Sequence, residues 1–253
     1  MATPLIQRTA RRVMRIVRPW SLSPADHESH RGGGSNVREV VFGANDGLVS
    51  NVALIAGLAG GTTDAGLILL GGIAGLVAGS VSMSLGAYIS TKSERELRDA
   101  EEARERWEVE HMRDQEIAET RAIFEAKGIH GPLLDQVVEA VTSDKEQWIR
   151  VMMTDELGYA DQPPKPVTSA VVMGIAFAVA AAFPVAPYFF AEGTAAFAAS
   201  LSLAGLALFA VGAWRGYLTS HAVLRKGAEM VLLAAAAVVA ANLIGRLVGV
   251  TIA

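Results

Sequence analysis

Long apolar runs recur along the chain at lengths that suit membrane-spanning helices. The clearest run, residues 65–91, has twenty-seven positions without a charge. At roughly 1.5 Å per residue, such a helix is longer than the ~30 Å hydrocarbon core of a bilayer. Further runs predict spans over residues 37–61, 167–191, 193–213 and 228–250. The pattern therefore predicts an all-α membrane protein with five transmembrane helices.

Charged residues concentrate between the second and third predicted spans. Apolar residues make up 51% of the chain, yet residues 92–162 (the acidic segment) hold nineteen acidic and ten basic residues. The rest of the chain holds only seven acidic and twelve basic residues. Helix stop and start signals at Gly128, Pro132 and Gly158 predict three amphipathic helices, the first of which continues the second span. We therefore expect a three-helix acidic module inserted between the second and third spans.

The predicted organisation has four parts. Residues 1–36 form a basic arm, residues 37–91 the first two spans, residues 92–162 the acidic module and residues 163–253 the last three spans. Lysine and arginine gather in the arm, in the acidic segment and between the last two spans. The connections at residues 60–64 and 184–193, on the other side of the membrane, have none. By the positive-inside rule, the N-terminus and the module lie in the cytoplasm and the C-terminus lies outside.

The basic arm allows two interpretations. Between Ile6 and Arg18 it carries five arginines among apolar residues at helical spacing, which is typical of an amphipathic helix at a membrane surface. An arginine-rich transit peptide is the alternative. His27 and His30 have the spacing of a metal-binding pair, although solvated histidines are the simpler explanation.

The first two predicted spans carry residues suited to a transport path. Asp46 interrupts an apolar run, where a carboxylate costs about 2.5–3.5 kcal/mol by insertion scales and so marks a functional candidate. The alternative for Asp46 is an interfacial helix cap. Gly71, Gly75 and Gly79 form a ridge that lets another helix approach closely, and the same four-residue step continues to Met83. Met83 is either a thioether ligand or ordinary packing.

Paired glutamates mark the acidic segment. Glu105 and Glu108 are three residues apart, as are Glu116 and Glu119, and the two pairs are offset by eleven residues. On a straight helix the pairs would lie about 16 Å apart, too far to share an ion. A chain reversal between His111 and Asp114 would bring them together. Oxygen clusters of this kind suit hard or borderline divalent cations, whereas the alternative is a solvated face paired with arginines at i,i+4.

The third helix of the module adds sulfur ligands to the glutamates. Met152 and Glu156 share a helix face at i,i+4, and Met153 adjoins them. Because the chain has no cysteine, a metal site must use oxygen, imidazole or thioether ligands.

Four stretches together resemble the vacuolar iron transporter family in residue type and in spacing, namely REVVFGANDGLVSNVALIAGLAGG, GLVAGSVSMSLGAYIS, SERELRDAE and MTDELG. The resemblance runs from about Arg38 to the C-terminus. It implies a homodimer that exports Fe2+ or Mn2+ from the cytoplasm in exchange for protons, with a transmembrane site at Asp46 and Met83. The ligands that it implies in the cytoplasmic module are Glu105, Glu108, Glu116, Glu119, Met152, Met153 and Glu156.

Two features depart from the family pattern. The family commonly has Gly-Glu-Tyr after the serine–methionine motif of the second span, whereas this chain has Ala87 between Gly86 and Tyr88. One acidic group near the cytoplasmic end of the path is therefore missing. The family's helix break between the glutamate pairs lacks its proline here, but the spacing of the glutamates still predicts a break between His111 and Asp114.

These features favour a transporter over an enzyme. A membrane-tethered ferritin-type di-iron oxidase would need two Glu-x-x-His motifs on different helices, and only Glu108 with His111 fits. A metal-sensing membrane scaffold is a second alternative, and the acidic composition argues against nucleic-acid binding. We expect Fe2+ or Mn2+ as cargo, Zn2+ as a surrogate, no permanently bound cofactor, and a lipid membrane and a second copy as partners. The membrane would be the inner (plasma) membrane of a bacterium or the vacuolar membrane of a eukaryote.

Overall fold

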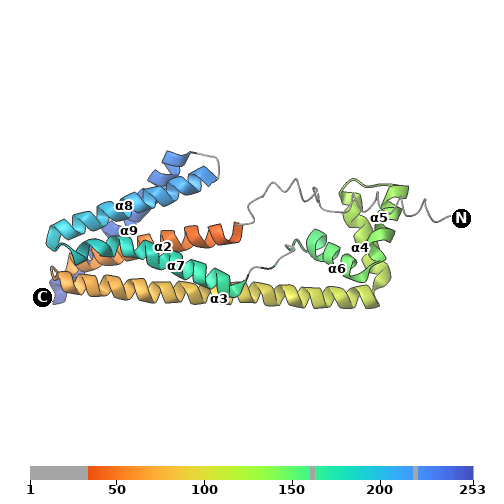
Figure 1. The fold of residues 1–253 in the computed structure, drawn as a ribbon, viewed down its shortest axis with the longest axis horizontal. Coiled ribbons are helices and arrows are strands. Elements are labelled where there is room, and N and C mark those ends of the chain that lie inside the picture. Colours follow the sequence, from red (N-terminus) through yellow and green to blue (C-terminus); the bar gives the residue numbers. More distant parts are fainter. Residues whose placement is uncertain (1–33, 160–162, 164, 219–221, 253) are drawn as a thin grey trace. The chain divides into compact units, whose positions relative to one another are not determined.

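The computed structural model describes residues 34–159, 163, 165–218 and 222–252. His27, His30 and the basic arm up to residue 33 lie outside the described residues. The described elements are all helices, in agreement with the predicted all-α class (Figure 1). In chain order they are α2 (Gly34–Gly61), α3 (Ala65–His111), α4 (Arg113–Ala126), α5 (Pro132–Thr142), α6 (Lys145–Val151), the π-helix η1 (Met152–Glu156), α7 (Pro166–Val185), the 3-10 helix η2 (Ala186–Phe189), α8 (Gly193–Leu218) and α9 (Val223–Ile252).

The chain divides into two compact units. One consists of Gly32–Thr91 and Lys165–Ala253, and the other includes Lys92–Pro164. Helix α3 is 47 residues long and contributes to both units. Its charge-free half, residues 65–91, is the part that suits a membrane.

Five helices of the described chain are long and apolar enough to cross a membrane, as predicted. The first candidate span, Val37–Gly61, has the predicted bounds. The third span differs at its end, because α7 gives way at Ala186 to a 3-10 helix that reaches Phe189 rather than residue 191. The fourth and fifth helices are longer than predicted, since polar residues at their ends, such as Arg215 and Lys226, are also helical.

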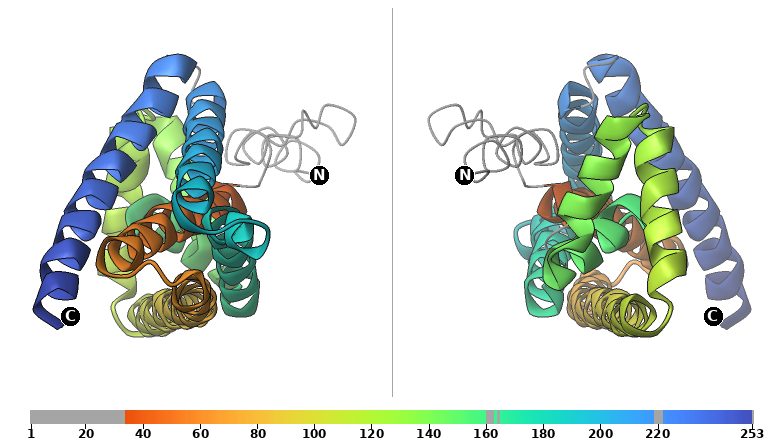
Figure 2. Two further views of the ribbon diagram at one scale, coloured as in Figure 1. Left: turned by 90° about the vertical axis from the view of Figure 1, so that its left-hand side faces the viewer. Right: turned by 90° about the vertical axis from the view of Figure 1, so that its right-hand side faces the viewer.

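Helix α2 is the centre of the apolar unit. It packs against α7, α8 and α9, and the end-on views show it among α3, α7, α8 and α9 (Figure 2). Glycines permit this approach, because a Cβ atom at Gly47 would lie 2.4 Å from the Phe177 carbonyl oxygen and one at Gly245 would lie 1.9 Å from the Gly57 carbonyl oxygen. Small residues thus let the helix backbones come into contact. Such close packing holds helices together in lipid, because burial of apolar surface does not drive their association there.

The acidic unit has a hydrophobic core of its own. Trp148, Val137, Val141 and Met152 are completely buried in it. The helix boundaries follow the predicted signals, since α4 is followed by Gly128 with φ of 86°, α5 begins at Pro132, and Gly158 with φ of 72° follows η1. Positive φ values of this kind favour glycine, which explains both stops.

The predicted helix break between the glutamate pairs is confirmed. Helix α3 ends at His111 and α4 begins at Arg113, with Met112 between them. Ion pairs then tie α3 to α6, from Arg106 to Glu146 and from Lys145 to Glu110. Exposed pairs of this kind contribute about 0–1 kcal/mol each, so the buried core carries most of the stability of the unit.

Replacement of Gly47 by valine should destabilise the apolar unit. The new side chain would collide with the Phe177 backbone, which cannot move aside as a flexible side-chain tip can. We expect a loss of about 1–3 kcal/mol and a lower melting temperature of the purified protein in detergent. Gly205→Ala is the matched control, because a Cβ atom there meets nothing within 4 Å. Equal melting temperatures for the two variants would contradict the close packing of α2 on α7.

Candidate functional site

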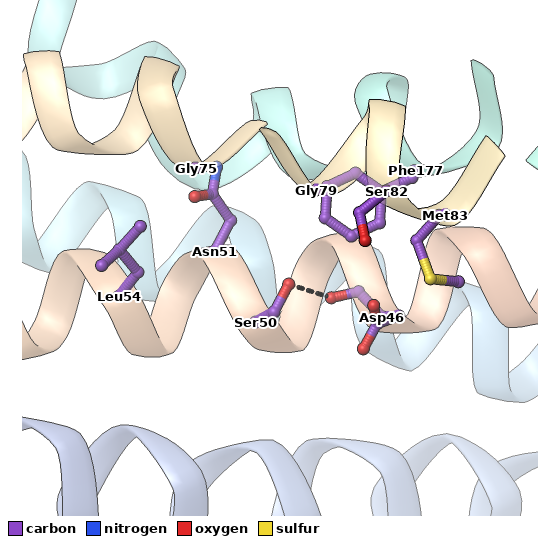
Figure 3. Close-up of a pocket in the computed structure, with 9 residues that line it drawn as sticks. All are labelled: Asp46, Ser50, Asn51, Leu54, Gly75, Gly79, Ser82, Met83 and Phe177. Carbon is purple, nitrogen blue, oxygen red and sulfur yellow. Dashed lines mark hydrogen bonds between the residues drawn. The ribbon is translucent and has the colours of Figure 1, made fainter. Parts of the chain in front are cut away.

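A cleft with a volume of about 240 Å³ lies where α2, α3 and α7 meet (Figure 3). Its walls combine a carboxylate, an amide, two hydroxyls, a thioether and an aromatic ring. The residues that line it are Asp46, Ser50, Asn51, Leu54, Gly75, Gly79, Ser82, Met83 and Phe177.

Asp46 and Met83, predicted from the sequence to share a site, line this one cleft. Asp46 is half-buried in the middle of α2, far from either helix end. The alternative of an interfacial helix cap is therefore wrong. The Ser50 hydroxyl bonds to the backbone carbonyl of Asp46, not to its carboxylate. Met83 comes from the facing helix α3 and brings a soft sulfur to the same space (Figure 3).

The predicted glycine ridge of α3 shapes the cleft. A Cβ atom at Gly71 would lie 2.4 Å from Leu58, one at Gly75 2.4 Å from Leu54, and one at Gly79 2.2 Å from the Phe177 ring. The ridge therefore lets side chains of α2 and α7 reach the α3 backbone, whereas the prediction was that another helix would approach closely there. Met83, one step further along α3, lies at the end of this contact line.

Asn51 is a cleft residue that sequence reasoning missed. It is only 2% exposed, and its Nδ2 donates to the Ala181 carbonyl oxygen at 2.8 Å and to the Gly72 carbonyl oxygen at 3.3 Å. Its Oδ1 is buried and accepts no hydrogen bond from any described residue. The only sequence signal was a polar residue in an apolar run five positions after Asp46.

A second cluster of polar groups lies in the acidic unit. The turn at Met112 brings Glu105 of α3 close to Glu116 of α4, and these carboxylates are 5% and 3% exposed. Glu108 is partly buried, whereas Glu119 and Glu156 are exposed at the edge of the cluster.

Burial and mutual repulsion make these carboxylates hard to ionise. Burial, followed by the charges of Glu116 and Glu156, raises the pKa of Glu105 to about 8. Burial and then the charge of Glu119 raise the pKa of Glu116 and that of Glu156. Oε1 of Glu105 and Oε2 of Glu116 are buried without a hydrogen-bond partner among the described residues. A bound cation would relieve both the repulsion and the missing contacts.

The carboxylates lie near one another but do not form a complete metal-binding site. Among the residues that the structure describes, no group of three or more His, Asp or Glu side chains is arranged to hold a single ion. Glu108 is instead engaged by Arg104, with 3.1 Å from Nε to Oε1. This is the i,i+4 salt bridge of the alternative interpretation, and it applies to this one glutamate of the cluster.

The two methionines of the third helix lie in the core of the acidic unit. Met152 is fully buried and Met153 is 4% exposed, and the Sδ atom of Met152 lies 3.4 Å from the Thr120 hydroxyl. The segment is a π-helix rather than the predicted α-helix, because the Leu157 amide bonds to the Met152 carbonyl oxygen five residues earlier. π-turns often mark functional sites, and this one leaves Glu156 exposed beside the buried sulfur atoms.

The chain is similar in sequence to known proteins over most of its length. Residues 37–246 match the sequence model of the VIT family. The chain is 34% identical over 216 residues to vacuolar iron transporter 1 of Eucalyptus grandis, covering 85% of this chain and 87% of that protein. It is 33% identical over 236 residues to vacuolar iron transporter 1 of Arabidopsis thaliana, with coverage of 92% and 94%. The family match spans most of the chain, so the protein belongs to the VIT family.

Proposed function

We propose that the protein carries divalent metal ions, Fe2+ foremost and Mn2+ as a second cargo, out of the cytoplasm in exchange for protons. The observation that carries the proposal is the meeting of Asp46 and Met83 in one cleft between apolar helices. The relatives from Eucalyptus grandis and Arabidopsis thaliana, which are named vacuolar iron transporters, support iron as the cargo.

The chemistry of the cleft suits exchange. A half-buried carboxylate among apolar residues is stabilised either by a proton or by a metal ion, and one group cannot hold both well. Asp46 would therefore release a proton when it takes a cation and rebind one after the cation has left. The Met83 thioether would favour Fe2+ over Mg2+ or Ca2+, which prefer oxygen ligands throughout.

The acidic cluster would collect the cargo. Its five carboxylates offer oxygen ligands at concentrated negative charge, and the buried, unpaired oxygens of Glu105 and Glu116 support a cation there. Met152 and Met153, which are buried in the core of the acidic unit, remain proposed sulfur ligands. The full proposed set is Glu105, Glu108, Glu116, Glu119, Met152, Met153 and Glu156.

Two further parts of the proposal concern the membrane. The positive-inside rule supports a cytoplasmic location for the acidic module. We also propose a homodimer, because α3 and α9 carry many exposed apolar side chains, such as Leu70 and Leu232. A second copy or lipid would cover such faces. The membrane would be vacuolar in a eukaryote and the inner membrane in a bacterium.

The enzyme alternative is less well supported. A di-iron centre built on Glu108 and His111 would need the His111 ring free to bind metal. The ring stacks on Trp107 at 4.7 Å between ring centroids. His111 also bonds through Nδ1 to the Trp107 carbonyl oxygen at 2.9 Å. A transporter therefore remains the better conclusion.

Asp46→Asn should abolish metal transport while the protein stays folded in the membrane. The amide has a similar shape but can neither carry the charge nor exchange a proton. Fe2+ uptake into proteoliposomes containing the purified variant measures this directly, with reconstitution efficiency checked by protein content. Transport at the wild-type rate by this variant would refute the role of Asp46.

Glu116→Gln should weaken metal binding by the acidic cluster by about tenfold or more, since it removes a buried charged ligand. Calorimetric titration of the full-length protein in detergent with Mn2+ or Zn2+ would measure the change. Glu139→Gln is the matched control, because Glu139 is an exposed acid on α5 outside the cluster. If both variants bind metal as the wild type does, the cluster is not the binding site.

Metal binding by the acidic cluster should also depend on pH. The pKa of Glu105 is about 8 rather than the ordinary 4.5, so protons compete with metal ions for this carboxylate at every pH below about 8. The affinity of the cluster for metal should therefore rise with pH and level off above about 8. Without metal, the stability of the fold should depend on pH in the opposite direction. A raised folded-state pKa stabilises the fold at acid pH, and this contribution is lost as the pH rises through about 8.

Melting temperatures with and without Mn2+ at about pH 6 and about pH 9 test both signs. We expect the stabilisation by Mn2+ to be larger at the higher pH, and Glu105→Gln to reduce the difference between the two pH values. A metal effect that is the same at both pH values would argue against proton competition at Glu105.

A further inference from the structure

We propose that the end of α8 and the start of α9 form a binding site for the head group of an anionic phospholipid. The cations of this site (the basic patch) are Arg215, Arg225 and Lys226. They gather where the candidate span Gly193–Tyr217 ends and the candidate span Val223–Gly249 begins. Lipid head groups occupy this level of a bilayer. The inference goes beyond metal transport, since the patch shares no residue with the transport cleft or with the acidic cluster.

Close packing of α8 on α9 brings the cations of the two helices together. A Cβ atom at Gly212 would lie 2.6 Å from the Lys226 carbonyl oxygen, and one at Gly227 would lie 2.8 Å from the Phe209 ring. The two helices therefore touch at their backbones just before Arg215 and at Lys226 itself. The last turns of α8 and the first turns of α9 lie side by side at one end of the apolar unit (Figure 1).

The carboxylate of Glu229 shows that the three cations are neighbours. Nζ of Lys226 lies 3.0 Å from Oε2 of Glu229. The positive charges of Arg215 and Arg225 act on the same carboxylate from nearby. One negative charge does not balance three positive charges, so these four groups together are positive. A phosphate group would find complementary charge here.

The surroundings of the basic patch favour a lipid over a soluble anion. Arg215 and Arg225 are exposed. Exposed apolar and aromatic side chains accompany them, since Trp214 is 40%, Tyr217 73% and Leu224 74% exposed. Tryptophan and tyrosine concentrate at the boundary between a membrane and water. A phospholipid offers a phosphate to the cations and acyl chains to these side chains, whereas a soluble anion offers only the charge.

The chemistry of the patch selects among phospholipids. Arginine donates paired hydrogen bonds to phosphate oxygens, and lysine adds a concentrated charge. Basic pockets between membrane helices bind anionic head groups in this way. Phosphatidylcholine also has a phosphate, but its quaternary ammonium group would be repelled by the cations. We therefore expect phosphatidylglycerol, which has a net negative charge, to bind more tightly than phosphatidylcholine.

Native mass spectrometry of the purified full-length protein in detergent, titrated with phosphatidylglycerol or phosphatidylcholine, tests the site. Replacing both Arg215 and Arg225 by glutamine should weaken phosphatidylglycerol binding by about 25-fold, at about fivefold for each cation. Phosphatidylcholine binding should change little. Arg246→Gln is the matched control and should bind as the wild type does, because Arg246 is an exposed arginine near the opposite end of α9.

Glu229→Gln should have the opposite effect. It removes the negative charge that pairs with Lys226, so phosphatidylglycerol should bind about fivefold more tightly. A gain in affinity cannot result from misfolding. If the double arginine variant fails to fold, as judged by its melting temperature, Glu229→Gln therefore decides, and unchanged or weaker binding by this variant would overturn the site.

Two other results would also overturn the proposal. The first is wild-type affinity for phosphatidylglycerol in the folded double variant, or an equal loss in Arg246→Gln, which would mean that charge attracts the lipid without a specific site. The second is displacement of phosphatidylglycerol by inorganic phosphate at equal concentration, which would identify a site for a soluble anion. Retention of the lipid in the presence of phosphate supports the assignment.

Discussion

Carboxylates that are taken out of water dominate the chemistry of this chain. A buried carboxylate that lacks a partner is costly, and it is stabilised by a proton or by a cation. Asp46 is half-buried in an apolar helix, and Glu105 and Glu116 are buried in the acidic unit, each with one oxygen that has no hydrogen-bond partner among the described residues. At both places the favoured partners are positive and interchangeable, which is the physical requirement for a protein that collects metal and exchanges it for protons.

The cleft around Asp46 exists because glycines replace side chains on the facing helices. Gly43 and Gly47 bring α7 onto α2, while Gly75 and Gly79 make room on α3 for side chains from α2 and α7. Close backbone approach leaves backbone carbonyls that can hold Asn51 by its nitrogen. The same packing that stabilises the helices in lipid thus orients polar atoms toward a small space between them.

Much of this could be predicted from the sequence, because its strongest signals are local. Apolar run length predicted the five spans, and Gly128, Pro132 and Gly158 predicted helix ends. The break after His111 followed from glutamate spacing together with the family resemblance. Asn51 was missed because its importance depends on carbonyls far away in the sequence, at Gly72 and Ala181. The π-helix at Met152 was also missed, since a hydrogen bond over five residues leaves no simple periodic pattern.

The central claim is that metal and protons exchange through one membrane path. Liposomes that contain the purified protein, a metal-sensitive dye and a pH-sensitive dye test it most directly. With an Fe2+ gradient imposed, the account predicts a metal flux accompanied by a proton flux in the opposite direction. Metal flux without any proton movement would contradict the exchange mechanism, and the absence of metal flux from well-folded protein would contradict transport itself.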